Sequence, residues 1–158
     1  MAWTSPRTWV ASEVVTAALL NTHVRDNLKA VGDAWTSYTP TYTNFTLGNG
    51  TVSAFYQSAG KQTMYRGLIT LGTTSSVTGN IRISLPATAG FSGFGYPFAG
   101  AVSILDTSAS LRWVRFPLLQ SSTEFYIGDA TDTRTSATAP MTWATGDTIS
   151  WQFVYEAA

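Results

Sequence analysis

Acidic side chains near the C-terminal end are the first candidates for chemistry in this sequence. Asp129 and Asp132 lie in a polar stretch, and Glu124 precedes them in a strand-like run. The two aspartates could hold Ca²⁺ together with backbone carbonyls, although their spacing matches no EF-hand loop. Glu124 with one aspartate could instead form the carboxylate pair of a glycosidase, which requires a fixed separation that the sequence does not give.

The other catalytic patterns are missing from the sequence. His23 is the only histidine, and it lies in a predicted helix, whereas a hydrolytic triad needs a base held beside its nucleophile. The chain has no cysteine and no HExxH, GxSxG, GxGxxG or P-loop motif. We therefore predict a protein that is not an enzyme and that holds no metal and no cofactor.

Composition limits the partners. Nine acidic and nine basic residues give no net charge, so the basic surface that binds nucleic acid or anionic membranes is not expected. The start MAWTSPR lacks the pattern of a signal peptide, and no apolar run is long enough to insert into a membrane. The chain is 13% aromatic and 11% charged, which is typical of an all-β protein that packs against neighbours.

The spacing of apolar residues predicts one helix, over residues 16–31. Thr16 can cap its start, and Gly32 stands where a left-handed C-cap is common. Its narrow apolar stripe is formed by Leu20, Val24, Leu28 and Val31. A helix of this length is marginal in water, so the stripe must bury against the chain's own β domain or against copies of itself around a symmetry axis. The charged residues that flank the stripe favour self-association.

Two tryptophans, Trp3 and Trp9, lie in the non-periodic segment before the helix. Tryptophan is a favoured anchor at interfaces, so this segment could dock into a larger particle. Alternatively, both indoles fold back on their own domain.

Alternating apolar and polar residues predict the β strands. Asn49-Gly50 predicts a two-residue hairpin turn, after which strands follow at 51–57, 62–71 and 81–85. Gly67 inside the second of these indicates a bulge or a close backbone approach. Further strands are expected at 33–44, 101–105, 111–119, 123–127 and 148–156, the third of them bulged or peripheral at its proline. We predict an antiparallel, jelly-roll-like β-sandwich over residues 34–158, behind a docking segment and oligomerisation helix in residues 1–33.

A glycine- and aromatic-rich stretch at 87–100 is long for a simple connection. Phe91, Phe94 and Tyr96 could contact a sugar or protein ligand, together with Asp129 and Asp132. The alternative is that the stretch covers one end of the sandwich or a subunit interface.

The sequence also resembles a family of phage proteins. The opening WVASEVVTAALLNTHVRDNL is similar to the start of minor tail and tail-fibre proteins of phages that infect actinobacteria, where a tryptophan-containing segment leads into a helix with LNTHVRDNL. The stretches WTSYTPTYTNFTLGNGTVSAFYQSAGK, LGTTSSVTGNIRISLPATA and ATGDTISWQFVYEAA resemble the single β domain behind that helix. The similarity covers nearly the whole chain and is carried by structural motifs.

The resemblance implies a homotrimeric virion protein, made in the host cytoplasm. The N-terminal segment would bind other tail or capsid proteins, and the β domain would face a glycan or protein of the host surface. The chain lacks repeats, a collagen-like region and a long coiled coil, so a short appendage is expected. Two other classes stay open at this point: a capsid decoration protein, which is also often a trimeric β domain, and a carbohydrate-binding or depolymerising protein.

Overall fold

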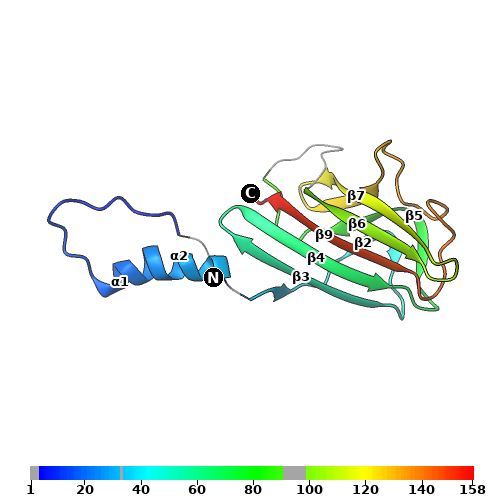
Figure 1. The fold of residues 1–158 in the computed structure, drawn as a ribbon, viewed down its shortest axis with the longest axis horizontal. Helices are drawn as coiled ribbons and strands as arrows, with labels where there is room; N and C mark the ends of the chain where they lie inside the picture. The colour runs from blue at the N-terminus through cyan, green and yellow to red at the C-terminus, as the bar shows by residue number, and fades with distance from the viewer. Residues whose placement is uncertain (1–3, 33, 91–98) are drawn as a thin grey trace.

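One helix, with a π-helical turn in its middle, precedes the β domain. The computed structural model describes residues 4–32, 34–90 and 99–158. The helix consists of α1 (Ala17–Leu20), the π-helical segment η1 (Asn21–Arg25) and α2 (Asp26–Gly32). Thr16 caps it as predicted, because its Oγ1 accepts a hydrogen bond from the amide of Leu19 at 3.3 Å. Figure 1 shows the helix projecting from one end of the β domain.

Nine strands in the described residues form the β domain, and every pairing between them is antiparallel. Their order across the sheet is β1-β3-β4-β9-β6-β7-β8-β5-β2. The prediction of an all-β fold behind one short helix is thereby confirmed. The strands are β1 (Thr36–Ser37), β2 (Tyr42–Thr46), β3 (Thr51–Ala59), β4 (Gln62–Thr70), β5 (Ser76–Ser84), β6 (Ala99–Asp106), β7 (Leu111–Ser121), β8 (Glu124–Gly128) and β9 (Thr148–Glu156).

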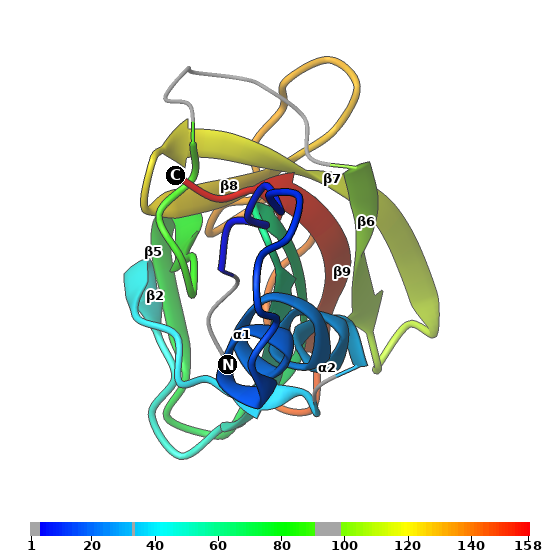
Figure 2. The same ribbon diagram turned by 90° about the vertical axis from the view of Figure 1, so that its left-hand side faces the viewer.

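The sheet curls into two layers that are joined through β7. Arg115 of β7 still pairs with β6, whereas Phe116 already pairs with Gly128 of β8. Pro117 follows at this crossing and has no N–H to donate, which suits a strand that is changing partners. At the opposite side, β1 pairs with β3 and β2 pairs with β5, so the segment 36–46 joins the two edges. Figure 2 shows the resulting curled sheet end on.

Aromatic rings fill the space between the layers. Every second residue of β9 faces inward, as the sequence predicted for that strand. Phe153 of β9 lies edge to face against Tyr65 of β4 at 5.5 Å and against Phe125 of β8 at 4.9 Å between ring centroids. Burial raises the pKa of the Tyr65 hydroxyl well above its usual range. The core cluster contains no residue of the helix.

The predicted Asn49-Gly50 hairpin is wrong. The positive φ in this turn belongs to Gly48, at 57°, and the two flanking strands do not pair with each other. The turn instead passes from one layer to the other, and the side-chain oxygen of Asn49 accepts a hydrogen bond from the amide of Thr74 at 2.9 Å. The predicted left-handed cap at Gly32 is also wrong, because this residue is still inside α2 and has no positive φ.

Candidate functional site

The segment before the helix folds back along it, and Asn27 holds the two together. The Asn27 side chain is buried and makes two hydrogen bonds to the backbone of Thr4. Its Nδ2 donates to the carbonyl of Thr4 at 2.8 Å, and its Oδ1 accepts from the Thr4 amide at 2.9 Å. Asn27 was not among the residues predicted from the sequence. An amide side chain on the helix, one residue before Leu28 of the stripe, was the available signal.

Trp9 lies on this returning segment and is 41% exposed. The Arg7 guanidinium lies over its ring at 5.0 Å and pairs with Glu13, whose Oε2 accepts from the amide of Val10 at 3.2 Å. The indole therefore stays with its own segment, and its role in docking to a particle stays a prediction. Trp3 lies outside the described residues.

The predicted apolar stripe of the helix faces solvent. Leu20 is 46% exposed, Val24 43%, Leu28 70% and Val31 57%. Part of the stripe lines a mainly apolar groove of about 250 Å³, which is formed by Pro6, His23, Val24, Asn27, Leu28 and Val31. The β domain leaves these four side chains exposed. It contacts the C-terminal end of the helix, where Gln57 Nε2 of β3 donates to the Val31 carbonyl over 3.1 Å.

The two predicted ligand-contact aspartates hold their own loop together. Asp129 Oδ1 accepts from the Thr131 hydroxyl at 2.7 Å and from the amides of Thr131 and Thr133, both at 2.9 Å, while its Oδ2 accepts from Arg115. The hydrogen bond from the Thr131 hydroxyl is the largest of the effects that lower the pKa of Asp129 to about 2. Asp132 Oδ1 accepts from the hydroxyl of Tyr126 at 2.7 Å. Both carboxylates thus have structural partners.

Glu124 and Asp129 are not brought together as a catalytic pair. They lie at opposite ends of β8, and five strand residues span about 16 Å, whereas glycosidase carboxylates are separated by about 5 to 9.5 Å. Glu124 is instead held by Arg82 at 3.3 Å and by the Thr43 hydroxyl at 2.9 Å. No group of three or more potential metal ligands occurs among residues 4–32, 34–90 and 99–158.

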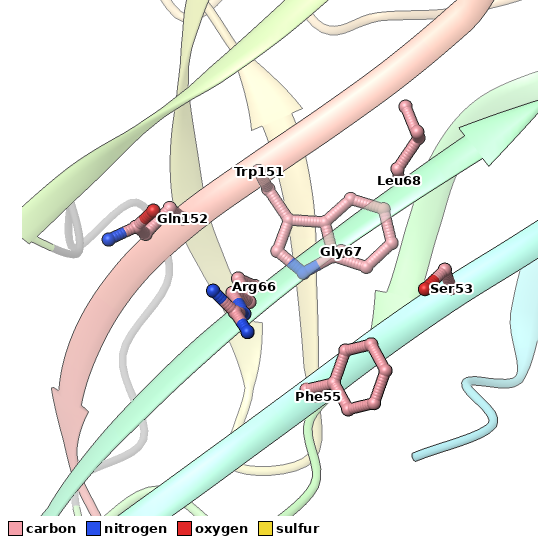
Figure 3. A pocket seen from close by; sticks show the side chains of 7 residues that line it. All are labelled: Ser53, Phe55, Arg66, Gly67, Leu68, Trp151 and Gln152. Carbon is pink, nitrogen blue, oxygen red and sulfur yellow. The ribbon is translucent and has the colours of Figure 1, made fainter. Parts of the chain in front are cut away.

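A hollow of about 320 Å³ opens on the outer face of β3, β4 and β9 (Figure 3). Its floor is Gly67, where the Trp151 indole packs so closely that a Cβ would overlap it. The prediction for this glycine was a bulge or a close backbone approach, whereas the neighbour is a side chain and the register of β4 is unbroken. On the same face, the Arg66 guanidinium lies 4.2 Å from the Trp35 ring centroid and 5.7 Å from that of Phe55. Arg66 is exposed, and its guanidinium lies against these two rings beside the hollow.

The aromatic candidates Phe91, Phe94 and Tyr96 lie outside the described residues. None of the described helices is long and apolar enough to cross a lipid bilayer. No family model matches the sequence, and searches of curated proteins and of solved structures find no similar protein. The functional proposal therefore depends on the geometry above and on the resemblance noted in the sequence.

Proposed function

We propose that this protein is a short trimeric appendage of a phage virion, of the minor tail or fibre type, which contributes to attachment to the host surface. The observation that carries the proposal is the exposed apolar stripe on a helix that projects away from the β domain. A helix of this length gains little stability on its own in water, so an uncovered stripe needs a partner. Copies of the same helix supply a matching apolar surface.

The stripe favours self-association but does not determine how many chains associate. The number three comes from the resemblance to trimeric tail proteins. In such an assembly the helices meet at the axis near the particle and the β domains point outward. Three weak sites on one axis, repeated over several appendages, gain avidity through effective concentration. A β domain with one modest ligand site then suffices for attachment.

Light scattering on the purified chain tests the trimer. We expect a mass three times that of the 17.0 kDa chain. Leu20→Asp combined with Val24→Asp places two charges in the stripe and should return the mass to that of one chain. Val14→Asp is the control, because Val14 is 81% exposed but precedes the helix.

A wild-type chain that stays monomeric at all concentrations contradicts the trimer. A trimer that survives both aspartates shows that the helix is not its anchor. Antibody labelling of phage particles, viewed by electron microscopy, tests the location: signal on the tail supports the proposal, and signal over the capsid favours the decoration protein considered above.

A further inference from the structure

A polar pocket of about 230 Å³ lies on the outer face of the layer formed by β7, β8, β5 and β2. It is distinct from the helix stripe and from the hollow at Gly67. Its lining residues are Asn44, Asn80, Arg82, Gln120, Tyr126 and Arg134.

The polar pocket forms where two neighbouring strands separate. β5 and β8 pair only from Arg82 with Tyr126 to Ser84 with Glu124. Beyond this point Thr135 lies between them: its carbonyl accepts from the Ile81 amide at 2.9 Å, and its amide donates to the Ile127 carbonyl at 2.7 Å. This inserted segment brings the preceding residue, Arg134, over the ring of Tyr126, at 4.4 Å from the ring centroid.

Two β-bulges point further side chains into the polar pocket. The β2–β5 register shifts between Thr43 and Phe45, and Asn44 at the shift has a φ of 58°. The β7–β8 register shifts between Leu119 and Ser121, which makes Gln120 the extra residue. Bulges redirect side chains and are frequent beside binding sites, and a left-handed non-glycine residue is a strained conformation that tends to occur there as well. In the first bulge the extra residues lie on β5, between Val77 and Arg82, opposite Asn44. Asn44 and Asn80 from this bulge and Gln120 from the other line the same pocket.

Neighbouring groups hold the side chains of the pocket in place. Arg82 Nη1 lies 3.3 Å from Glu124 Oε2, and Glu124 Oε1 accepts from the Thr43 hydroxyl at 2.9 Å. Asn44 Nδ2 donates to the Asn80 carbonyl at 3.0 Å. Tyr126, which carries the Arg134 guanidinium on its ring, is fixed through its hydroxyl by Asp132. Side chains that are already ordered lose less entropy when a ligand binds.

We propose that the polar pocket binds a saccharide that carries an anionic oxygen group, either a carboxylate or a phosphate. Two guanidinium groups and three side-chain amides line it, and no described carboxylate does. Guanidinium groups recognise carboxylate and phosphate through paired N–H donors. The amides of Asn44, Asn80 and Gln120 offer the donors and acceptors that sugar hydroxyls need. The role of the polar pocket in recognising a host receptor rests on the proposed function. Binding of an anionic sugar depends only on the residues that line the pocket.

Titration of the full chain with three sugars tests the proposal. The probes are glucuronate, glucose 6-phosphate and uncharged glucose. Their binding is measured by calorimetry and by the NMR shifts of the backbone amides. We expect the anionic sugars to bind about tenfold more tightly than glucose, because a hydrogen bond to a charged group is stronger than a neutral one. The shifts should centre on Asn44, Gln120 and Arg134. Binding should weaken in about 1 M NaCl, where charges are screened within about 3 Å.

Arg134→Gln should remove most of the preference for the anionic sugars. Arg112→Gln is the matched control, because Arg112 is exposed on β7 and donates to Ser103 of β6, in the other layer. Asn44→Gly is the second variant: glycine accepts the positive φ without strain, so the backbone is kept while the amide is lost. Asn44→Gly should weaken the binding of each sugar that the wild-type chain binds. This variant therefore tests the polar pocket even if Arg134→Gln does not fold.

Tighter binding of glucuronate identifies the carboxylate, and tighter binding of glucose 6-phosphate identifies the phosphate. Equal binding of glucose and the anionic sugars, shifts located elsewhere, or an equal loss in Arg112→Gln each overturns the proposal. The oligomeric state separates this result from the proposed function. A trimer without sugar binding overturns the polar pocket alone, and a monomer that binds sugar overturns the trimer alone.

Discussion

At the scale of single residues, the contact between Gly67 and Trp151 constrains the packing of the β domain. β4 is hydrogen-bonded to β3 on one side and to β9 on the other, so the backbone at residue 67 has little room to move. The indole of Trp151 lies directly on the position that a side chain would occupy, as Figure 3 shows. The absence of a side chain at this position is therefore part of the core packing.

Gly67→Ala should destabilise the β domain by about 1 to 3 kcal/mol, because the added methyl group overpacks the core against the Trp151 ring. Chemical denaturation followed by tryptophan fluorescence measures the free energy of unfolding. Gly32→Ala is the control, since a Cβ there meets nothing within 4 Å. Equal stability of Gly67→Ala and the wild type would contradict the packing described here.

Asp129 should make the stability of the fold depend on pH in the acid range. Its pKa is lowered to about 2 in the folded protein, chiefly by the Thr131 hydroxyl, and is about 3.9 in an unfolded chain. The ionised carboxylate therefore stabilises the fold fully above about pH 4, and this contribution disappears as the pH falls through 2. Asp129→Asn should be less stable than wild type at pH 6, and the difference should shrink between pH 4 and pH 2. Urea denaturation at several pH values measures it, and a difference that does not change with pH would refute the role of the charge.

At the scale of elements, the N-terminal segment and the helix form one unit through Asn27. Asn27→Ala removes both hydrogen bonds to Thr4 and should release the returning segment. Hydrogen exchange at the Thr4 amide measures this and should become faster, while the circular dichroism of the β domain stays the same. Asn21→Ala on the same helix is the control, because Thr4 is bonded to Asn27 and not to Asn21. Unchanged protection of Thr4 in Asn27→Ala would show that the segment is held by other contacts.

Elements set by local pattern could be predicted from the sequence, and those set by distant pairing could not. The helix, its Thr16 cap and β9 follow from spacing that is read within a few residues. The prediction for the Asn49-Gly50 turn was wrong because its local signature is that of a hairpin. In the structure β2 pairs with β5 instead, from Thr46 with Ser76 to Tyr42 with Ile83.

The polar pocket was missed for the same reason. Asn44 and Gln120 enter it only because two registers shift, and a shift depends on partner strands that the sequence does not name. Asp129 and Asp132 lie in the loop that carries Arg134, and their oxygens hold the loop and Tyr126 in place. Their contact with a ligand stays a prediction. The residue types could be read from the sequence, whereas the hydrogen bonds of each side chain could be read only from the structure.

At the scale of the whole molecule, the helix and the β domain share little surface, so they should be separable. All members of the core cluster, with the partly buried residues around it, lie between Tyr38 and Tyr155. We therefore expect residues 34–158, produced alone, to fold with the same thermal midpoint as the full chain at equal protein concentration, measured by circular dichroism in the strand region. If the helix is the anchor of the trimer, this fragment should also be monomeric by light scattering. A partner that binds only the folded state raises the stability of that state by mass action. A monomeric fragment that melts several degrees lower than the full chain would therefore mean that the β domains also contact one another in the trimer. A fragment that does not fold at all would contradict the division of the chain at residues 33 and 34.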